Sequence, residues 1–133
     1  MMKQAMKARV MPAILMAGMV LGAVTIVAAE ENDTVRLIEA LNSENLGQRI
    51  SAAHLLGEYE DTSAVRPLIA MLQNDSEYSA RTSAAIALLR IGDIRAIAAL
   101  KKSSLNDSNN IVRSVATEAY IMLQVSMVKF TSE

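Results

Sequence analysis

His54 is the only histidine of the chain, and its imidazole is the side chain best suited to bind a metal or to act as a general base. Either role needs a second ligand or an acidic partner close by. The sequence contains no His-x-x-x-His, His-Glu or His-x-x-Glu arrangement that would supply a second ligand. We therefore expect His54 to be an exposed or structural residue rather than a catalytic one.

The other side chains that could take part in catalysis or bind a metal also lack suitable partners. The chain has no cysteine, which excludes thiol nucleophiles, disulfides and cysteine-ligated zinc or iron–sulfur clusters. Glu58, Glu60 and Asp61 lack the alternating oxygen ligands and the turn glycine of a calcium loop, so a solvated helix end explains them better. No glycine-rich phosphate loop or nucleophile elbow is present. We predict that the protein is not an enzyme and has no catalytic residue, cofactor or bound metal.

Composition and charge narrow the range of partners. Aromatic residues make up 3% of the 133 residues and tryptophan is absent, so little material is available for stacking against bases. From Glu30 onward the chain carries 10 Lys and Arg residues and 14 acids, a formal charge of −4. Because phosphate binding depends on clustered Lys and Arg, we expect no nucleic-acid partner.

One pattern recurs along the chain at a spacing of 32 residues, and it is best developed at 81–93. A fixed period of 20 to 50 residues is typical of solenoids, in which each repeat stacks on its neighbours. Within each period the apolar spacing predicts two helices, so that six are expected in all. The equivalent positions include Arg49, Arg81 and Arg113, and the alanines Ala52, Ala53, Ala84, Ala85 and Ala116. The predicted helices cover about 34–42, 48–59, 63–73, 78–91, 94–104 and 110–128.

The recurring alanines indicate where stacked helices approach one another, because a methyl side chain lets two helix axes come close. Pro67 lies near the start of the third predicted helix, where its missing N–H matters least. Gly92 supplies a left-handed stop after the fourth. No single helix pair could bury its own apolar face, so we expect all three pairs to be needed for folding.

Residues 1–29 are predicted to be an export signal rather than part of the fold. Three basic residues precede the uncharged stretch 10–29, which ends in Val27-Ala28-Ala29, small residues suited to cleavage. The alternative is an uncleaved anchor, since this stretch matches the ~20 residues needed to cross a bilayer. We expect a protein exported to a bacterial periplasm or, in the alternative, anchored in the inner membrane and facing the periplasm.

Two segments of the second repeat carry a recognisable pattern, Asp61-Thr-Ser-Ala-Val-Arg-Pro-Leu-Ile-Ala-Met-Leu-Gln-Asn-Asp75 and then Arg81-x-x-Ala-Ala-x-Ala-Leu with Ile91-Gly-Asp. The pattern resembles the HEAT repeat of armadillo/HEAT α-solenoids, especially a short bacterial exported variety. The resemblance covers about 33–125 and is weakest where Lys101-Lys102-Ser103-Ser104 replaces the apolar end of a helix. It implies an all-α, right-handed α-solenoid of about three helix pairs. The repeat domain is expected at 30–133, with repeats at about 33–61, 62–92 and 93–128.

The resemblance also implies a ladder of charged residues between the layers. In HEAT repeats an Asp in the turn within a repeat and an Arg early in its second helix form this ladder. The second and third repeats keep both residues six positions apart, whereas the first has Ser43 in place of the Asp. We therefore expect a ladder that is incomplete at its N-terminal end, with members Arg49, Asp75, Arg81, Asp107 and Arg113.

In HEAT-like stacks the second helix of each pair lines the concave face, so its outward residues form columns that are suited to binding a partner. The residues expected to contact a partner there are His54, Glu58, Thr82, Ile86, Arg90, Ser114, Glu118 and Met122. The apolar end of the last helix adds Met127 and Phe130. Either this tail folds back over the last layer as a cap, or it docks a partner, a second copy or the membrane surface.

These features predict an exported, non-catalytic scaffold that binds a protein partner of unknown identity, with self-association through the C-terminal helix as a further option. One alternative is an enzyme-associated HEAT-like subunit of the lyase type, because bilin lyases carry similar repeats. The HEAT-like iron hydroxylases carry repeated His-Glu pairs, which this chain lacks. The other alternative is a membrane-tethered adaptor that retains the N-terminal helix, and a membrane contact is expected only in that case.

Overall fold

The computed structural model describes residues 33–132. Residues 33–36 belong to an N-terminal unit, within which the Arg36 guanidinium lies 3.8 Å from the Asp33 carboxylate. The fold described below is that of residues 37–132, which form the second unit. The expected export signal at 1–29 lies outside the described residues.

Residues 33–132 are helical throughout apart from short connections, and equivalent helices begin 32 residues apart. A helix over 33–40 comes first. The second helices of the three repeats are α3 (Leu46–Glu58), α5 (Tyr78–Ile91) and α7 (Asn110–Thr131). The first helices of the last two repeats are α4 (Val65–Asn74) and α6 (Ile97–Asn106), preceded by the 3-10 turns η1 (Thr62–Ala64) and η2 (Ile94–Ala96). The predicted all-α class is confirmed for this part of the chain.

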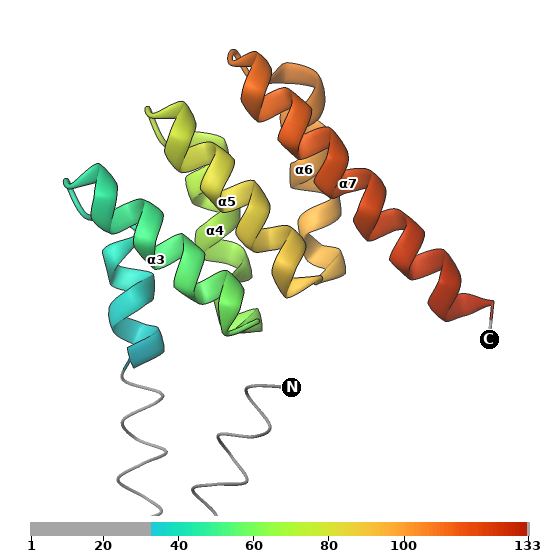
Figure 1. The fold of residues 1–133 in the computed structure, drawn as a ribbon, viewed down its shortest axis with the longest axis horizontal. Coiled ribbons are helices and arrows are strands. Elements are labelled where there is room, and N and C mark those ends of the chain that lie inside the picture. Colours follow the sequence, from blue (N-terminus) through green and yellow to red (C-terminus); the bar gives the residue numbers. More distant parts are fainter. Residues whose placement is uncertain (1–32, 133) are drawn as a thin grey trace, which may run out of the picture. The chain divides into compact units, whose positions relative to one another are not determined.

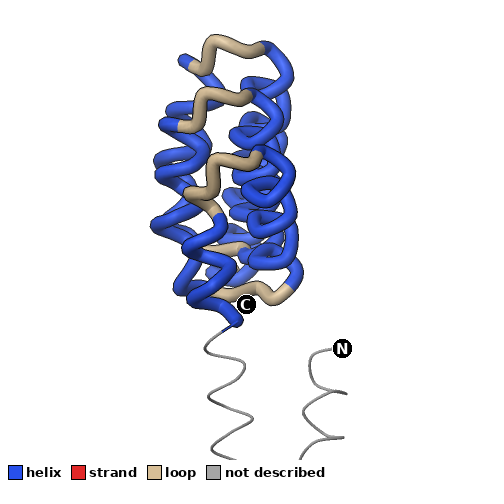
Figure 2. The backbone as a smooth tube through the Cα atoms, turned by 90° about the vertical axis from the view of Figure 1, so that its left-hand side faces the viewer, coloured by secondary structure: helices blue, strands red, loops and turns tan. Residues whose placement is uncertain are grey.

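The helices are arranged in two layers (Figure 1, Figure 2). In one layer α3 packs against α5 and α5 against α7. In the other layer α4 contacts α6, and the pairs α4–α5 and α6–α7 join the layers. Each repeat therefore contacts mainly the next one along the chain, which is the arrangement of a solenoid.

Small and large apolar residues share the core between the layers. The five recurring alanines are at most 2% exposed, as their predicted position at helix contacts requires. Fully buried leucines fill the remaining space, and each contributes about 2 kcal/mol relative to an exposed position. These leucines are Leu56, Leu68, Leu72, Leu88 and Leu100.

The first helices of the second and third repeats begin later than the sequence predicts. Asp61 Oδ1 accepts a hydrogen bond of 2.9 Å from the Ser63 N–H, and Asp93 Oδ1 accepts one of 2.8 Å from the Arg95 N–H. Each bond closes a tight turn two residues after the aspartate, so a 3-10 turn precedes the α-helix. The α-helices consequently begin at 65 and 97 rather than at 63 and 94.

The last helix, α7, is longer at its C-terminal end than α3 and α5, the equivalent helices of the first two repeats. The chain leaves α3 and α5 through residues in the left-handed region, Glu60 with φ 51° and Gly92 with φ 72°. The equivalent residue in the third repeat is Gln124, which lies inside α7. Residues 124–131 therefore extend α7 beyond its last buried residue, Leu123 (Figure 1). The idea that the tail folds back over the last layer is wrong.

An arginine at the start of each second helix links its own turn to the next layer. Arg49 Nη1 donates to the carbonyl oxygens of Ser43 at 2.8 Å and Glu44 at 3.1 Å. The other edge of the same guanidinium meets the Asp75 carboxylate of the next repeat, with Nε–Oδ2 at 2.8 Å and Nη2–Oδ1 at 3.1 Å. Such a bidentate pair has both geometric specificity and strength.

Arg81 repeats this arrangement one layer further on. Its Nη1 donates to the carbonyls of Asp75 at 2.8 Å and Ser76 at 3.1 Å, and its Nε and Nη2 bind the Asp107 carboxylate at 2.9 and 3.0 Å. The side chains of the two ion pairs are only 8% to 12% exposed. Removing either partner of a pair would therefore leave a charge in a poorly hydrated site.

The ladder is open at its C-terminal end, not at the N-terminal end that we expected. Each Asp pairs with the Arg of the preceding repeat, so the absence of an acid at Ser43 leaves Arg49 fully bonded. Arg113 Nη1 still donates to the carbonyls of Asp107 at 2.7 Å and Ser108 at 3.2 Å. Within residues 37–132, however, no carboxylate pairs with Arg113.

Gly57 marks the closest approach between α3 and α5. A Cβ atom at this position would lie 3.0 Å from the Cα and 3.2 Å from the Cβ of Ala87. Because the nearer atom belongs to the backbone of the facing helix, it cannot move aside as a side-chain tip would. The hydrogen at Gly57 thus sets the spacing of the first two layers, a role that the alanine pattern did not reveal.

Replacing Arg81 by Met should destabilise the protein more than replacing Arg113 by Met. Both substitutions remove two bonds to turn carbonyls, each worth about 1 kcal/mol. Only Arg81→Met also leaves the buried Asp107 carboxylate unpaired, so it should cost about 3 kcal/mol more than Arg113→Met. Urea unfolding followed by circular dichroism measures both values, and equal losses would show that the ion pair adds nothing.

The pH dependence of the unfolding free energy should show the contribution of the Arg81–Asp107 ion pair. Burial raises the pKa of Asp107, but hydrogen bonds from Arg81 and the Asn109 N–H and the charges of Arg81 and Arg113 outweigh it, so the pKa lies below its usual 3.8. A lowered pKa stabilises the fold above pH 3.8, and this stability is lost as the pH falls through the lower, folded-state value.

The difference in unfolding free energy between wild type and Asp107→Asn should therefore be full at pH 7 and shrink below about pH 4. Urea titrations at several pH values measure this difference. A difference that stays constant down to pH 3 contradicts the assignment.

Gly57→Val should separate α3 from α5 and cost about 2 kcal/mol, because overpacking a close helix contact forces the backbone to shift. Ser51→Val is the matched control, since Ser51 is an exposed residue of the same helix. It carries the same β-branched penalty without the contact. Thermal unfolding should show a clear decrease in Tm for Gly57→Val and little change for the control.

Candidate interaction surface

The outward side of α3, α5 and α7 carries most of the residues that we expected to contact a partner. Of the residues expected to contact a partner, Thr82 is half-buried and its hydroxyl donates to the Tyr78 carbonyl at 2.8 Å. The others are exposed, namely His54, Glu58, Ile86, Arg90, Ser114, Glu118, Met122, Met127 and Phe130. The structure thus brings together two groups of them, one on α3 and α5 and one along α7.

A chain of polar side chains crosses from α3 to α5. Arg90 Nη1 lies 3.1 Å from His54 Nδ1, and His54 Nε2 lies 3.3 Å from Glu58 Oε1. A guanidinium has only donors, so Nδ1 must accept from Arg90. The ring proton then lies on Nε2, from which it is donated to Glu58. The three exposed side chains thus contact one another across α3 and α5.

This arrangement explains why His54 is a poor candidate for chemistry. A general base or a metal ligand needs one ring nitrogen with a free lone pair. In His54 the only lone pair is directed at Arg90, and the other nitrogen carries the proton. The spacing of four residues between His54 and Glu58 was a signal in the sequence for this contact, whereas nothing local indicated Arg90.

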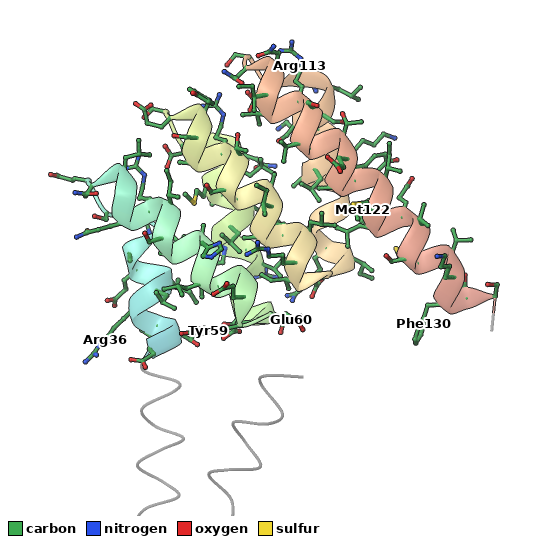
Figure 3. The ribbon with its side chains drawn as sticks, viewed as in Figure 1. Arg36, Tyr59, Glu60, Arg113, Met122 and Phe130 are labelled. Carbon is green, nitrogen blue, oxygen red and sulfur yellow. The ribbon has the colours of Figure 1, made fainter. Side chains whose placement is uncertain are left out.

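The far half of α7 exposes apolar side chains on two faces. Met127 and Phe130 continue the buried stripe of Ala119 and Leu123 beyond the end of the stack, and Phe130 is 87% exposed. A second group, Ile121, Met122, Val125 and Val128, lies on the side of the helix away from that stripe and is 49% to 67% exposed. Figure 3 shows Met122 midway along α7 and Phe130 near its C-terminal end.

By length and composition α7 is also the one described helix that could cross a membrane. Its first half, however, contributes Val112, Ala116 and Ala119 to the core. These residues pack in the stack and are not available to lipid. A membrane contact of α7 would therefore be limited to its C-terminal half.

Neither a small-molecule pocket nor a metal site stands out among the described residues. An open pocket of about 390 Å³ lies at the loop end of the first two layers, but its charged lining residues, Arg49 and Asp75, are already paired with each other. Within 33–132, no cluster of three or more His, Asp and Glu side chains is placed to hold a metal ion. The exposed helical faces remain the best candidate for function.

Comparison with known proteins agrees with this architecture. A family model of HEAT repeats matches residues 34–121, which are most of the chain. A search of curated proteins found no match. HEAT repeats commonly mediate protein–protein contacts and are generally non-catalytic. On the family match, the two-layer stack and the 32-residue period, the chain belongs to the HEAT-repeat family.

Proposed function

We propose that the protein is an exported, non-catalytic scaffold that binds a protein partner through the outward side of α3 and α5 and through the apolar end of α7. The observation that carries the proposal is the surface of α3 and α5, where the contacting side chains of His54, Glu58 and Arg90 lie beside the exposed Ile86. Its membership of the HEAT-repeat family supports a binding role, since HEAT repeats commonly bind proteins.

The composition of this surface suits a protein partner. Ile86 is 39% exposed and lies one helical turn from Arg90, whose guanidinium is held by His54. A mixture of apolar and charged groups of this kind is typical of non-obligate interfaces.

Export is proposed on the sequence of residues 1–29 alone. A basic start, an uncharged stretch and small residues before Glu30 favour a cleaved signal and delivery to the periplasm. The mass of the protein recovered after expression of the whole chain distinguishes this from a membrane-tethered adaptor. Loss of residues 1–29 supports the exported form, and their retention supports the tether.

Binding of the partner should be lost when two residues of α5 on this surface are changed in polarity and charge. The test expresses the whole chain, crosslinks proteins in the compartment to which it is delivered, and identifies those bound to it by mass spectrometry. The double variant Ile86→Asp with Arg90→Glu should abolish the crosslink seen with wild type, because the apolar side chain of Ile86 and the cation of Arg90 are both removed.

Lys102→Glu is the matched control, since Lys102 is exposed on α6 in the other layer. It changes the surface charge by the same amount as Arg90→Glu and should leave the crosslink intact. The proposal fails if wild type captures no protein, or if the α5 double variant captures the same protein equally well.

A further inference from the structure

We propose that the outer face of α7 binds a second copy of the chain, with the two α7 helices antiparallel about a twofold axis. The inference rests on the proposed function in one respect, namely that the end of α7 is an interaction surface. It goes further by naming the occupant of that surface and the contacts that select it.

Four exposed residues of α7 form one stripe, because they are spaced by four, three and four positions: Glu118, Met122, Val125 and Lys129. At 3.6 residues per turn, such spacing keeps side chains on the same face of a helix. Ile121 and Val128 lie beside the stripe and widen its apolar centre. The face points away from the side of the helix that is buried in the stack.

The charges of this stripe are complementary to themselves when one copy is reversed. Glu118 and Lys129 are three turns apart, or about 16 Å along the helix. A twofold axis between Leu123 and Gln124 places Glu118 of each copy opposite Lys129 of the other, and Met122 opposite Val125. A parallel pair would instead bring like charges together, which disfavours it.

Both charges are available for this contact. Within residues 37–132 no ion pair involves Glu118 or Lys129. A pair of opposite charges at the rim of an apolar contact mainly fixes its orientation and register. Here they would frame the apolar centre at both ends.

The shape of the fold leaves this face open. Residues 124–131 extend past the stack and are exposed, so no other described helix covers this half of α7 (Figure 1). The other half of the contact, around Glu118, lies on the outward side of the stack. Exposed apolar side chains that continue over three turns on one helix face are typical of an interaction site.

A fourth helical layer, stacked on the third, is a less suitable occupant of α7. Three positions that bury apolar groups between the second and third layers are polar on the free side of the third layer, although Ile121 keeps the apolar character of its equivalent Leu89. Lys101 and Ser104 replace Ile69 and Leu72 on the first helix, and Thr117 replaces Ala85 on the second. Polar residues of this kind are typical of a terminal repeat that faces water.

The contact is small, so the dimer should be weak. Two helix faces of three turns each bury less than the ~1,200 Å² of stable complexes, and a Kd on the order of micromolar is expected. Sedimentation velocity over a range of concentrations, on protein purified after expression of the whole chain, should show a monomer–dimer equilibrium in this range.

Charge reversal tests the register. Glu118→Lys and Lys129→Glu should each raise the Kd at least about tenfold, because each converts two attractive pairs into two repulsive ones. The double variant Glu118→Lys with Lys129→Glu restores both pairs in opposite sense and should return the Kd to near the wild-type value. All of these positions are exposed, and unchanged thermal unfolding will show that the monomer fold is intact.

Met127→Lys is the control for the choice of face. Met127 is also apolar and exposed, but it lies on the opposite side of α7 from the stripe, so its replacement should leave the Kd unchanged. The inference is overturned if wild type stays monomeric at several hundred micromolar, or if the double variant remains dissociated. It is also overturned if the monomer binds vesicles of phosphatidylethanolamine and phosphatidylglycerol through α7.

The crosslinking assay with the Ile86 and Arg90 double variant separates this inference from the proposed function. Capture of a partner by a protein that never dimerises would overturn the inference alone. Dimerisation without any captured partner would overturn the proposed scaffold and leave the antiparallel contact standing.

Discussion

The guanidinium groups at the start of α3 and α5 make the interaction on which the stack depends most directly. Each binds two carbonyls of its own turn along one edge and a carboxylate of the next layer along the other. One planar group therefore fixes the turn within a repeat and the distance to the next repeat at once. Since Arg81 and Asp107 are nearly buried, a shift of one layer against another would separate charges in a poorly hydrated site.

This link also gives the stack a direction. The arginine of one layer binds the aspartate of the next layer along the chain, as in Arg49–Asp75 and Arg81–Asp107. The two ends of the solenoid therefore differ in chemistry. Ser43 at the first layer receives no arginine of a preceding layer from the described chain, and Arg113 at the third offers an edge that remains open. The third layer also differs at the end of its second helix, because Gln124 continues the helix where Glu60 and Gly92 turn the chain.

The sequence was sufficient for the period, the six helices and most helix limits to within two residues, because these depend on local spacing and on caps. It was insufficient for the direction of the ladder, since the spacing of six between Asp and Arg is the same whichever layer the carboxylate binds. The contact of Arg90 with His54 joins residues 36 positions apart and has no local signal. Gly57 was overlooked because its equivalents, Leu89 and Ile121, are large, so the close approach occurs once and has no period.

Two ways of using an exposed helix compete at the end of such a stack, namely growth by a further layer and pairing side by side. Growth needs apolar groups on the free side of the last pair, where this chain has Lys101, Ser104 and Thr117 beside Ile121. Pairing needs apolar groups on the outward side of the last helix, where it has Met122 and Val125. The free side of the third repeat is thus more polar than the equivalent side of the second. This pattern favours association through the outward face of α7 over growth of the stack on the third layer.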